Sequence, residues 1–160
     1  MSEIKTYTQE EAHKHFAIST NGLVWQLLEK KGRSISDEEL MIHAAHTSCY
    51  HWLRVGTGLH HQRAEWLLSH VYAEVGNASA AIKHAKHCQD LTEEYIELMH
   101  DFDFAYTHEA LARAHALNGQ VDEAQMYILN ADIKGQAIAD KEDRDIFLAD
   151  FNGGNWYGLR

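Results

Sequence analysis

Residues 104–131, FAYTHEALARAHALNGQVDEAQMYILNA, decide the fold of this chain. The first half spaces its apolar and small residues three and four apart and ends at Gly119, a residue type that commonly closes a helix. The second half begins at Asp122, a favoured helix-starting residue, or at its neighbour, and places the small residues Ala124 and Ala131 on one face. The stretch therefore predicts two antiparallel helices joined by a short turn.

The preceding stretch repeats this pattern. Gly32, Gly76 and Gly119 lie 44 and 43 residues apart, a period typical of helical-hairpin repeats. A plain helical bundle with three unrelated glycine-terminated helices is the alternative, and the small residues that recur after each of the later glycines favour the repeat. Aligned on these two glycines, the residues that correspond are Leu68, Ser69, Tyr72, Ala81, Ala85 and Cys88 with Leu111, Ala112, His115, Ala124, Ile128 and Ala131.

The rest of the chain also predicts helices, and no proline interrupts them. Thr8 with Glu11, and Ser36 with Glu39, have the spacing of capping boxes at helix starts. We expect one all-α domain over residues 1–160, because the connections are short enough for antiparallel hairpins. Its expected parts are hairpins at about 8–55, 59–99 and 103–139, with helices meeting near 31–36, 76–77 and 119–122, a capping helix at 141–151 and an aromatic tail at 152–160.

The two later hairpins resemble the tetratricopeptide repeat family. The resemblance lies in AEWLLSHVYAEVG (64–76) with AAIKHA (80–85), and in residues 104–131 quoted above. The spacing is longer than the 34 residues usual in that family, and the usual proline after the second helix is missing. The resemblance implies a right-handed stack of three antiparallel hairpins plus a C-terminal capping helix, with a concave groove lined by the first helix of each hairpin.

The resemblance also implies a function: a non-catalytic interaction or scaffold module that binds a protein or peptide, which includes a second copy of the chain. No cofactor is expected in that case. Replacement of Arg63 or Arg113 by alanine should then abolish partner capture and leave stability nearly unchanged. The groove residues that the resemblance implies are Arg63, Trp66, His70, Glu74, Tyr106, Glu109 and Arg113.

The acidic composition argues against two classes of binding partner. The chain of 160 residues has 24 acidic and 14 basic side chains, a net charge of −10, which disfavours nucleic acids and anionic membranes. No apolar run reaches the roughly 18 residues needed to cross a bilayer. Two cysteines are too few for a disulfide framework, and we expect Cys49 and Cys88 to be small structural residues. A cytoplasmic location is therefore expected.

Thirteen histidines support two further hypotheses. His43 with His46, and His84 with His87, are three apart and could each present two ligands on one helix face. The alternative function is thus a metal-binding helical protein or a metal-dependent enzyme that uses a divalent ion such as zinc. Because histidine titrates near pH 6.5, a pH-responsive interaction protein is a third hypothesis. The tail with Trp156 and Tyr157 could dock on its own chain, in the groove, or in a dimer contact.

Overall fold

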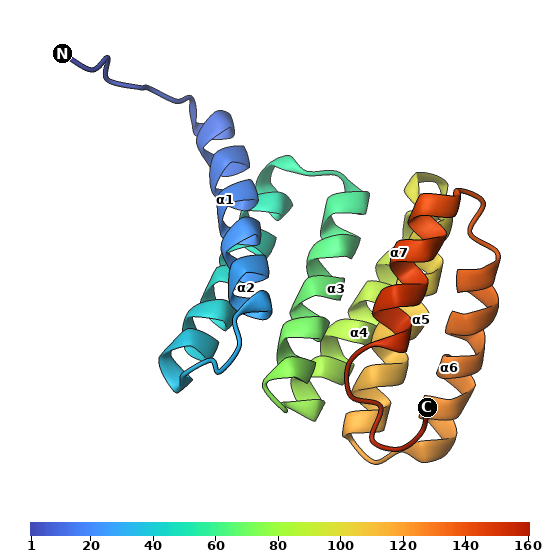
Figure 1. Ribbon diagram of the computed structural model, residues 1–160. Coiled ribbons are helices and arrows are strands. Elements are labelled where there is room, and N and C mark those ends of the chain that lie inside the picture. The colour runs from blue at the N-terminus through green and yellow to red at the C-terminus, as the bar shows by residue number, and fades with distance from the viewer.

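Seven α-helices and no strand form the protein in the computed structural model, which describes residues 1–160 (Figure 1). Residues 1–8 precede the first helix and extend away from the helices. The all-α prediction is confirmed. The helices are α1 (Gln9–Glu29), α2 (Ile35–Val55), α3 (Gly58–Glu74), α4 (Ala78–Glu94), α5 (Asp101–Leu117), α6 (Val121–Gln136) and α7 (Lys141–Asn152), with a short 3₁₀ turn, η1 (Ile96–Leu98), after α4.

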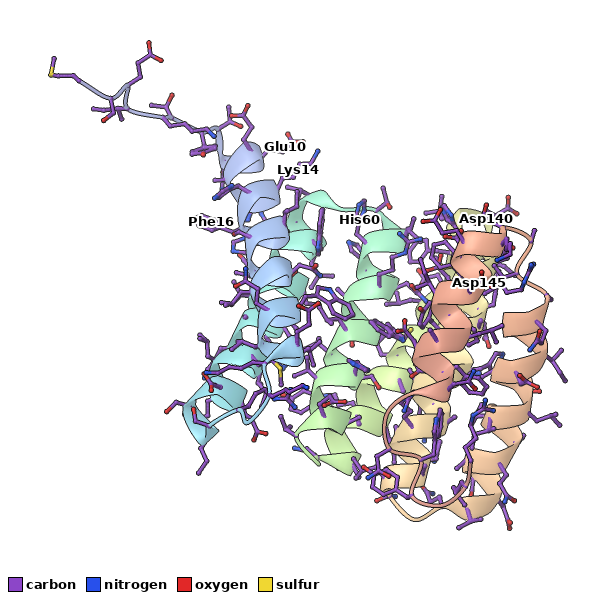
Figure 2. All side chains as sticks on the ribbon, in the orientation of Figure 1. Glu10, Lys14, Phe16, His60, Asp140 and Asp145 are labelled. Carbon is purple, nitrogen blue, oxygen red and sulfur yellow. The ribbon has the colours of Figure 1, made fainter.

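The hairpins form between consecutive helices. α1 packs most closely on α2, α3 on α4 and α5 on α6, while α2 with α3 and α4 with α5 join the hairpins in chain order. α7 packs on both α5 and α6 and lies in front of α5 in Figure 1. Figure 2 labels Asp140, the N-cap of α7, and Asp145 in its first turns, at the same end of the molecule as His60 at the start of α3. This packing is consistent with a stack of helical hairpins closed by one further helix.

Glycines end the first helix of each hairpin, as predicted. Gly32, Gly76 and Gly119 adopt φ values of +68°, +80° and +72°, a left-handed conformation that costs glycine little. The residues that follow the latter two make the same closing bond: Asn77 N–H donates to the carbonyl of Tyr72 at 2.9 Å, and Gln120 N–H to that of His115 at 3.0 Å. Tyr72 and His115 hold equivalent positions in the sequence alignment, so the two later hairpins repeat in geometry as well as in sequence.

Small residues allow the helices of each hairpin to approach closely. Ala81 and Ala85 of α4 and Ala124 and Ala131 of α6 are fully buried, as the alignment predicted. Ser69 of α3 donates to the carbonyl of Ala81 at 2.9 Å, a bond across the hairpin that a larger residue would prevent.

Two predicted helix boundaries are wrong. The second helix is capped by Ser34 with Asp37 rather than by Ser36 with Glu39, and Asp37 also accepts from Lys30 Nζ at 2.7 Å, which favours this earlier start. The helix expected to reach Met99 ends at Glu94 and continues as η1. The Thr8–Glu11 capping box is confirmed.

The C-terminal tail docks on its own chain. Trp156 is 5% exposed, its indole N–H donates to the carbonyl of Phe151 at 2.9 Å, and its ring meets that of Phe151 edge to face. Tyr157 remains exposed. None of the helices combines the length and apolar character needed to cross a bilayer.

Candidate binding groove

A groove lies between the first helices of the three hairpins and α7, and residues of all four helices line it. It contains two adjoining cavities, here named the Gln62 cavity and the Glu109 cavity. The Gln62 cavity, about 400 Å³, is lined by Asn21, Trp25, Gln62, Arg63, Trp66, Leu67, Phe102, Asp103, Tyr106, Ile146 and Asp150. The Glu109 cavity, about 260 Å³, is lined by Trp25, Trp66, His70, Glu74, Tyr106, Glu109, Arg113, Ala149, Asp150, Gly153 and Gly154.

All seven residues that the resemblance implied for the groove line these cavities. Arg63 lines the Gln62 cavity, Trp66 and Tyr106 line both, and the others line the Glu109 cavity: His70, Glu74, Glu109 and Arg113. They come together because residues on one face of α3 and α5 point to the same side of the stack, which is the periodicity that the sequence displays.

Aromatic rings form the wall between the two cavities. The Trp66 ring stacks on Trp25 of α1 with centroids 6.1 Å apart and on His70 at 5.2 Å, and it meets Tyr106 of α5 edge to face at 5.4 Å. The indole N–H of Trp66 is buried without a hydrogen-bond partner, and Trp25 is 40% exposed. The wall therefore presents ring faces together with one free donor.

Gln62 is held at the base of its cavity by a buried polar network. Its amide nitrogen donates to Thr92 Oγ1 and to Thr107 Oγ1, both at 3.1 Å. The threonine hydroxyls themselves donate to the backbone carbonyls of Cys88 and Asp103 at 2.7 Å, so their oxygens act as acceptors toward Gln62. This fixes the orientation of the amide and leaves its oxygen without a partner, although Gln62 is only 1% exposed.

Arg63 and Asp103 form an ion pair across α3 and α5. The guanidinium donates from Nε to Oδ1 at 2.9 Å and from Nη2 to Oδ2 at 3.1 Å, a two-point contact. Asp103 also accepts from the backbone N–H of His100 at 2.9 Å and so caps α5. Arg63 remains partly open to solvent, with 43% of its side chain exposed. Arg63 therefore both stabilises the packing of α3 on α5 and lines the groove.

Arg113 has a different role from the one that the sequence suggested. Its guanidinium pairs with Glu109 one turn earlier, donates to the carbonyls of Asp150 at 2.8 Å and Gly153 at 3.0 Å, and lies over the Trp156 ring at 4.1 Å. These contacts join α5 to the end of α7 and to the tail. We therefore now expect replacement of Arg113 to lower stability. The sequence pattern did not show that the tail docks on this side chain.

Two groove carboxylates differ in how their oxygens are partnered. Glu109 is 2% exposed, and its Oε2 has no hydrogen-bond partner. Asp150 accepts from the Tyr106 hydroxyl at 2.5 Å, and burial together with this hydrogen bond raises the pKa of Tyr106. No arginine or lysine pairs with Asp150, whereas Glu74 binds Arg33 at 3.1 Å. Asp150 is thus the groove carboxylate without a cationic partner.

Sequence reasoning missed several groove residues. Trp25 lies in the first hairpin, where the repeat resemblance is too weak to transfer the groove-facing positions, and Asp150 lies on the helix that was expected to serve only as a cap. Gln62 directly precedes the predicted Arg63, but adjacent helix residues point about 100° apart, so its position gave no signal either. The position of Asp150 gave no local signal, because it depends on how α7 packs on α5.

The predicted metal ligands separate into different environments. His46, His84 and His87 lie near one another around Glu65 of α3, whereas the ring of His43 is exposed and makes no hydrogen bond. No group of three or more His, Cys, Asp or Glu side chains is arranged to hold a metal ion. The residue that organises the histidines is Glu65, which the sequence analysis did not select.

Glu65 links α3 to α4 through the two histidines. Its Oε2 contacts His84 Nδ1 at 2.5 Å, and its Oε1 lies 3.2 Å from His87 Nδ1. Burial raises the pKa of the Glu65 carboxyl, but hydrogen bonding and positive charge from these histidines outweigh burial, and the pKa lies below its usual value. Burial is also the main cause of the lowered pKa of His46, whose Nε2 lies 2.8 Å from the Tyr72 hydroxyl.

The two cysteines are buried and unpaired, in keeping with a packing role. Burial raises the thiol pKa of both Cys49 and Cys88 to about 12, and the nearby Glu65 carboxylate contributes at Cys49. A thiol with so high a pKa is protonated at neutral pH and is a poor nucleophile or metal ligand.

The chain matches none of the protein-family models, curated proteins or solved structures with which it was compared.

Proposed function

We propose that this protein is a non-catalytic interaction module that holds a protein or peptide segment in the groove formed by α1, α3, α5 and α7. The observation that carries the proposal is a wall of rings flanked by polar atoms without partners. Trp66 offers a free N–H, while Gln62 and Glu109 offer free oxygens. A peptide carries both backbone N–H and C=O groups and can satisfy donors and acceptors in the same site.

The proposal includes a right-handed, tetratricopeptide-like arrangement of the hairpins. Matched glycine conformations in the two later hairpins support it, as does the gathering of first-helix residues on one side. The buried thiols, with their raised pKa, support a binding role over cysteine catalysis. Free cysteines are also usual in the cytoplasm, which is the location we propose.

The test is selection of random dodecapeptides displayed on phage against the full chain. Ala149→Trp adds a ring to an exposed position of α7 that lines the Glu109 cavity, and should block the groove without removing any core contact. Ala137→Trp is the matched control, because Ala137 is exposed at the end of α6 and lines neither cavity.

We expect peptides enriched on the wild-type chain to bind Ala137→Trp equally well and to lose binding to Ala149→Trp. Far-ultraviolet circular dichroism and melting temperature establish that both variants are folded. A selection that yields no peptide sensitive to Ala149→Trp would refute the proposed function.

A further inference from the structure

We infer that the groove selects a peptide segment with a cationic side chain, lysine or arginine, whose charge is met by Asp150. This inference rests on the proposed function and adds the chemistry of the partner to it. It follows from three independent features of the groove: its charges, its unpartnered buried atoms and its rings.

The charges of the groove leave one carboxylate uncompensated. Arg63 pairs with Asp103, Arg113 pairs with Glu109, and Arg33 outside the groove binds Glu74. Asp150 has only the neutral Tyr106 hydroxyl as a hydrogen-bond partner for its side chain. Because Asp150 lines both cavities and is exposed, a positive charge placed in either cavity can reach it.

Two of the three buried groove atoms without partners need a donor, while the third, the Trp66 N–H, needs an acceptor such as a backbone carbonyl of the peptide. The amide oxygen of Gln62 and Oε2 of Glu109 are acceptors, and their residues are 1% and 2% exposed. Such atoms are costly to leave unsatisfied in a folded protein. Both residues line the groove cavities, so a donor held there can satisfy these oxygens once the side chains around them adjust. A lysine or arginine side chain is slender, ends in several donors and has no acceptor.

The rings suit the same ligand. Trp25, Trp66 and Tyr106 line the cavity together with Asp150, and Trp25 is 40% exposed; a cation over the face of such a ring is attracted by the ring quadrupole. The chain already uses this contact, since the Arg113 guanidinium lies over Trp156. An acidic side chain would be repelled by Asp150, and a neutral donor would lack the charge attraction that a cation gains there.

The experiment uses the peptides obtained from phage selection and measures their affinity by fluorescence anisotropy. Asp150→Asn removes the charge and retains an oxygen that can accept from Tyr106. Asp145→Asn removes the same charge from the same helix, at an exposed residue labelled in Figure 2. Asp145 lines neither cavity. The backbone carbonyl of Asp150, which Arg113 binds, is unchanged in both variants.

We expect the selected peptides to be rich in lysine and arginine. Asp150→Asn should weaken their binding about tenfold or more, as expected for loss of a charge-assisted hydrogen bond, while Asp145→Asn should change it less than about twofold.

Other outcomes separate the two claims. Peptides that are blocked by Ala149→Trp but are neutral or acidic would overturn the cationic assignment and leave the groove as a binding site. Basic peptides that bind Asp150→Asn and Asp145→Asn equally would overturn it as well. Displacement of the peptide by an equal concentration of spermidine would assign the site to a free polyamine, against our choice of a peptide. A selection that yields no peptide sensitive to Ala149→Trp would refute the proposed function itself.

Discussion

Replacement of Arg113 by methionine tests whether the groove and the tail share one structural support. The change keeps much of the unbranched stem and removes the guanidinium. It deletes the ion pair with Glu109, the bonds to the carbonyls of Asp150 and Gly153, and the contact over the Trp156 ring. We expect a large loss of stability, because the remaining carboxylate of Glu109 is nearly inaccessible to water.

The magnitude is set mainly by Glu109, whose side chain is 3% exposed. Removal of one partner from a buried ion pair costs about 3–5 kcal/mol, because the other charge is left uncompensated. Loss of the cation over Trp156 adds about 0.5–2 kcal/mol. These effects are not additive, since Glu109 can take up a proton. The expected loss in the free energy of unfolding is about 4 kcal/mol, or roughly 8–16 °C in melting temperature.

Urea denaturation at pH 7, followed by circular dichroism, measures this loss. Lys141→Met is the matched control: Lys141 also pairs with an acid four residues away, Asp145, but its side chain is 80% exposed, and its removal should change stability by less than about 0.5 kcal/mol. The double variant Arg113→Met/Glu109→Gln removes the buried charge and should recover at least about 1 kcal/mol of the loss. A loss below about 1 kcal/mol for Arg113→Met, or a double variant no more stable than the single one, would refute this reasoning.

Two further predictions concern packing and pH. Gly22→Ala adds a Cβ in open space on α1 and should stabilise the protein by about 0.5–1 kcal/mol. Gly135→Ala adds a Cβ on α6 that would overlap the Phe147 ring, and should destabilise the protein by about 1–3 kcal/mol. Denaturation shifts of the same sign for both variants would contradict this packing. Burial, and then the charge of Lys134, lowers the pKa of His108 from 6.5. The folded protein therefore favours neutral His108, and the stability that this neutral side chain contributes is lost as pH falls below about 6.5. His108→Gln should therefore lose less stability than the wild-type chain between pH 7 and pH 5 in urea denaturation, and an equal loss in both would exclude His108 as a contributor.

Much of the groove was predicted from the resemblance to tetratricopeptide repeats, which chose one face of each first helix. Arg63, Trp66, His70 and Glu74 recur every three or four residues along α3, so their common face follows from the sequence once the helix is recognised. The same reasoning placed the groove residues of α5. It could not give the ion pair between Arg63 and Asp103, which depends on the relative rotation of two helices separated by α4.

The first hairpin and α7 were less predictable for the same reason. Trp25 faces the groove because of the way α1 packs, and the first hairpin matches the repeat only in its glycine and its length. Asp150 and Arg113 meet the tail because Trp156 folds back under the guanidinium. The wrong cap at Ser36 has a local cause, since two overlapping segments have the same capping pattern and the contact between Lys30 and Asp37 favours the earlier one.

The sequence by itself determined the helices, their glycine ends and the faces that each helix presents, because these depend on residues within a few positions of one another. Only the tertiary structure decided which side chains have partners. It paired Arg113 with Glu109 and the tail, gathered three histidines around Glu65, and left Asp150 without a cation. Ion pairs and cavities form between segments far apart in the chain, and they are fixed by the angles and rotations at which helices pack, which local patterns do not encode.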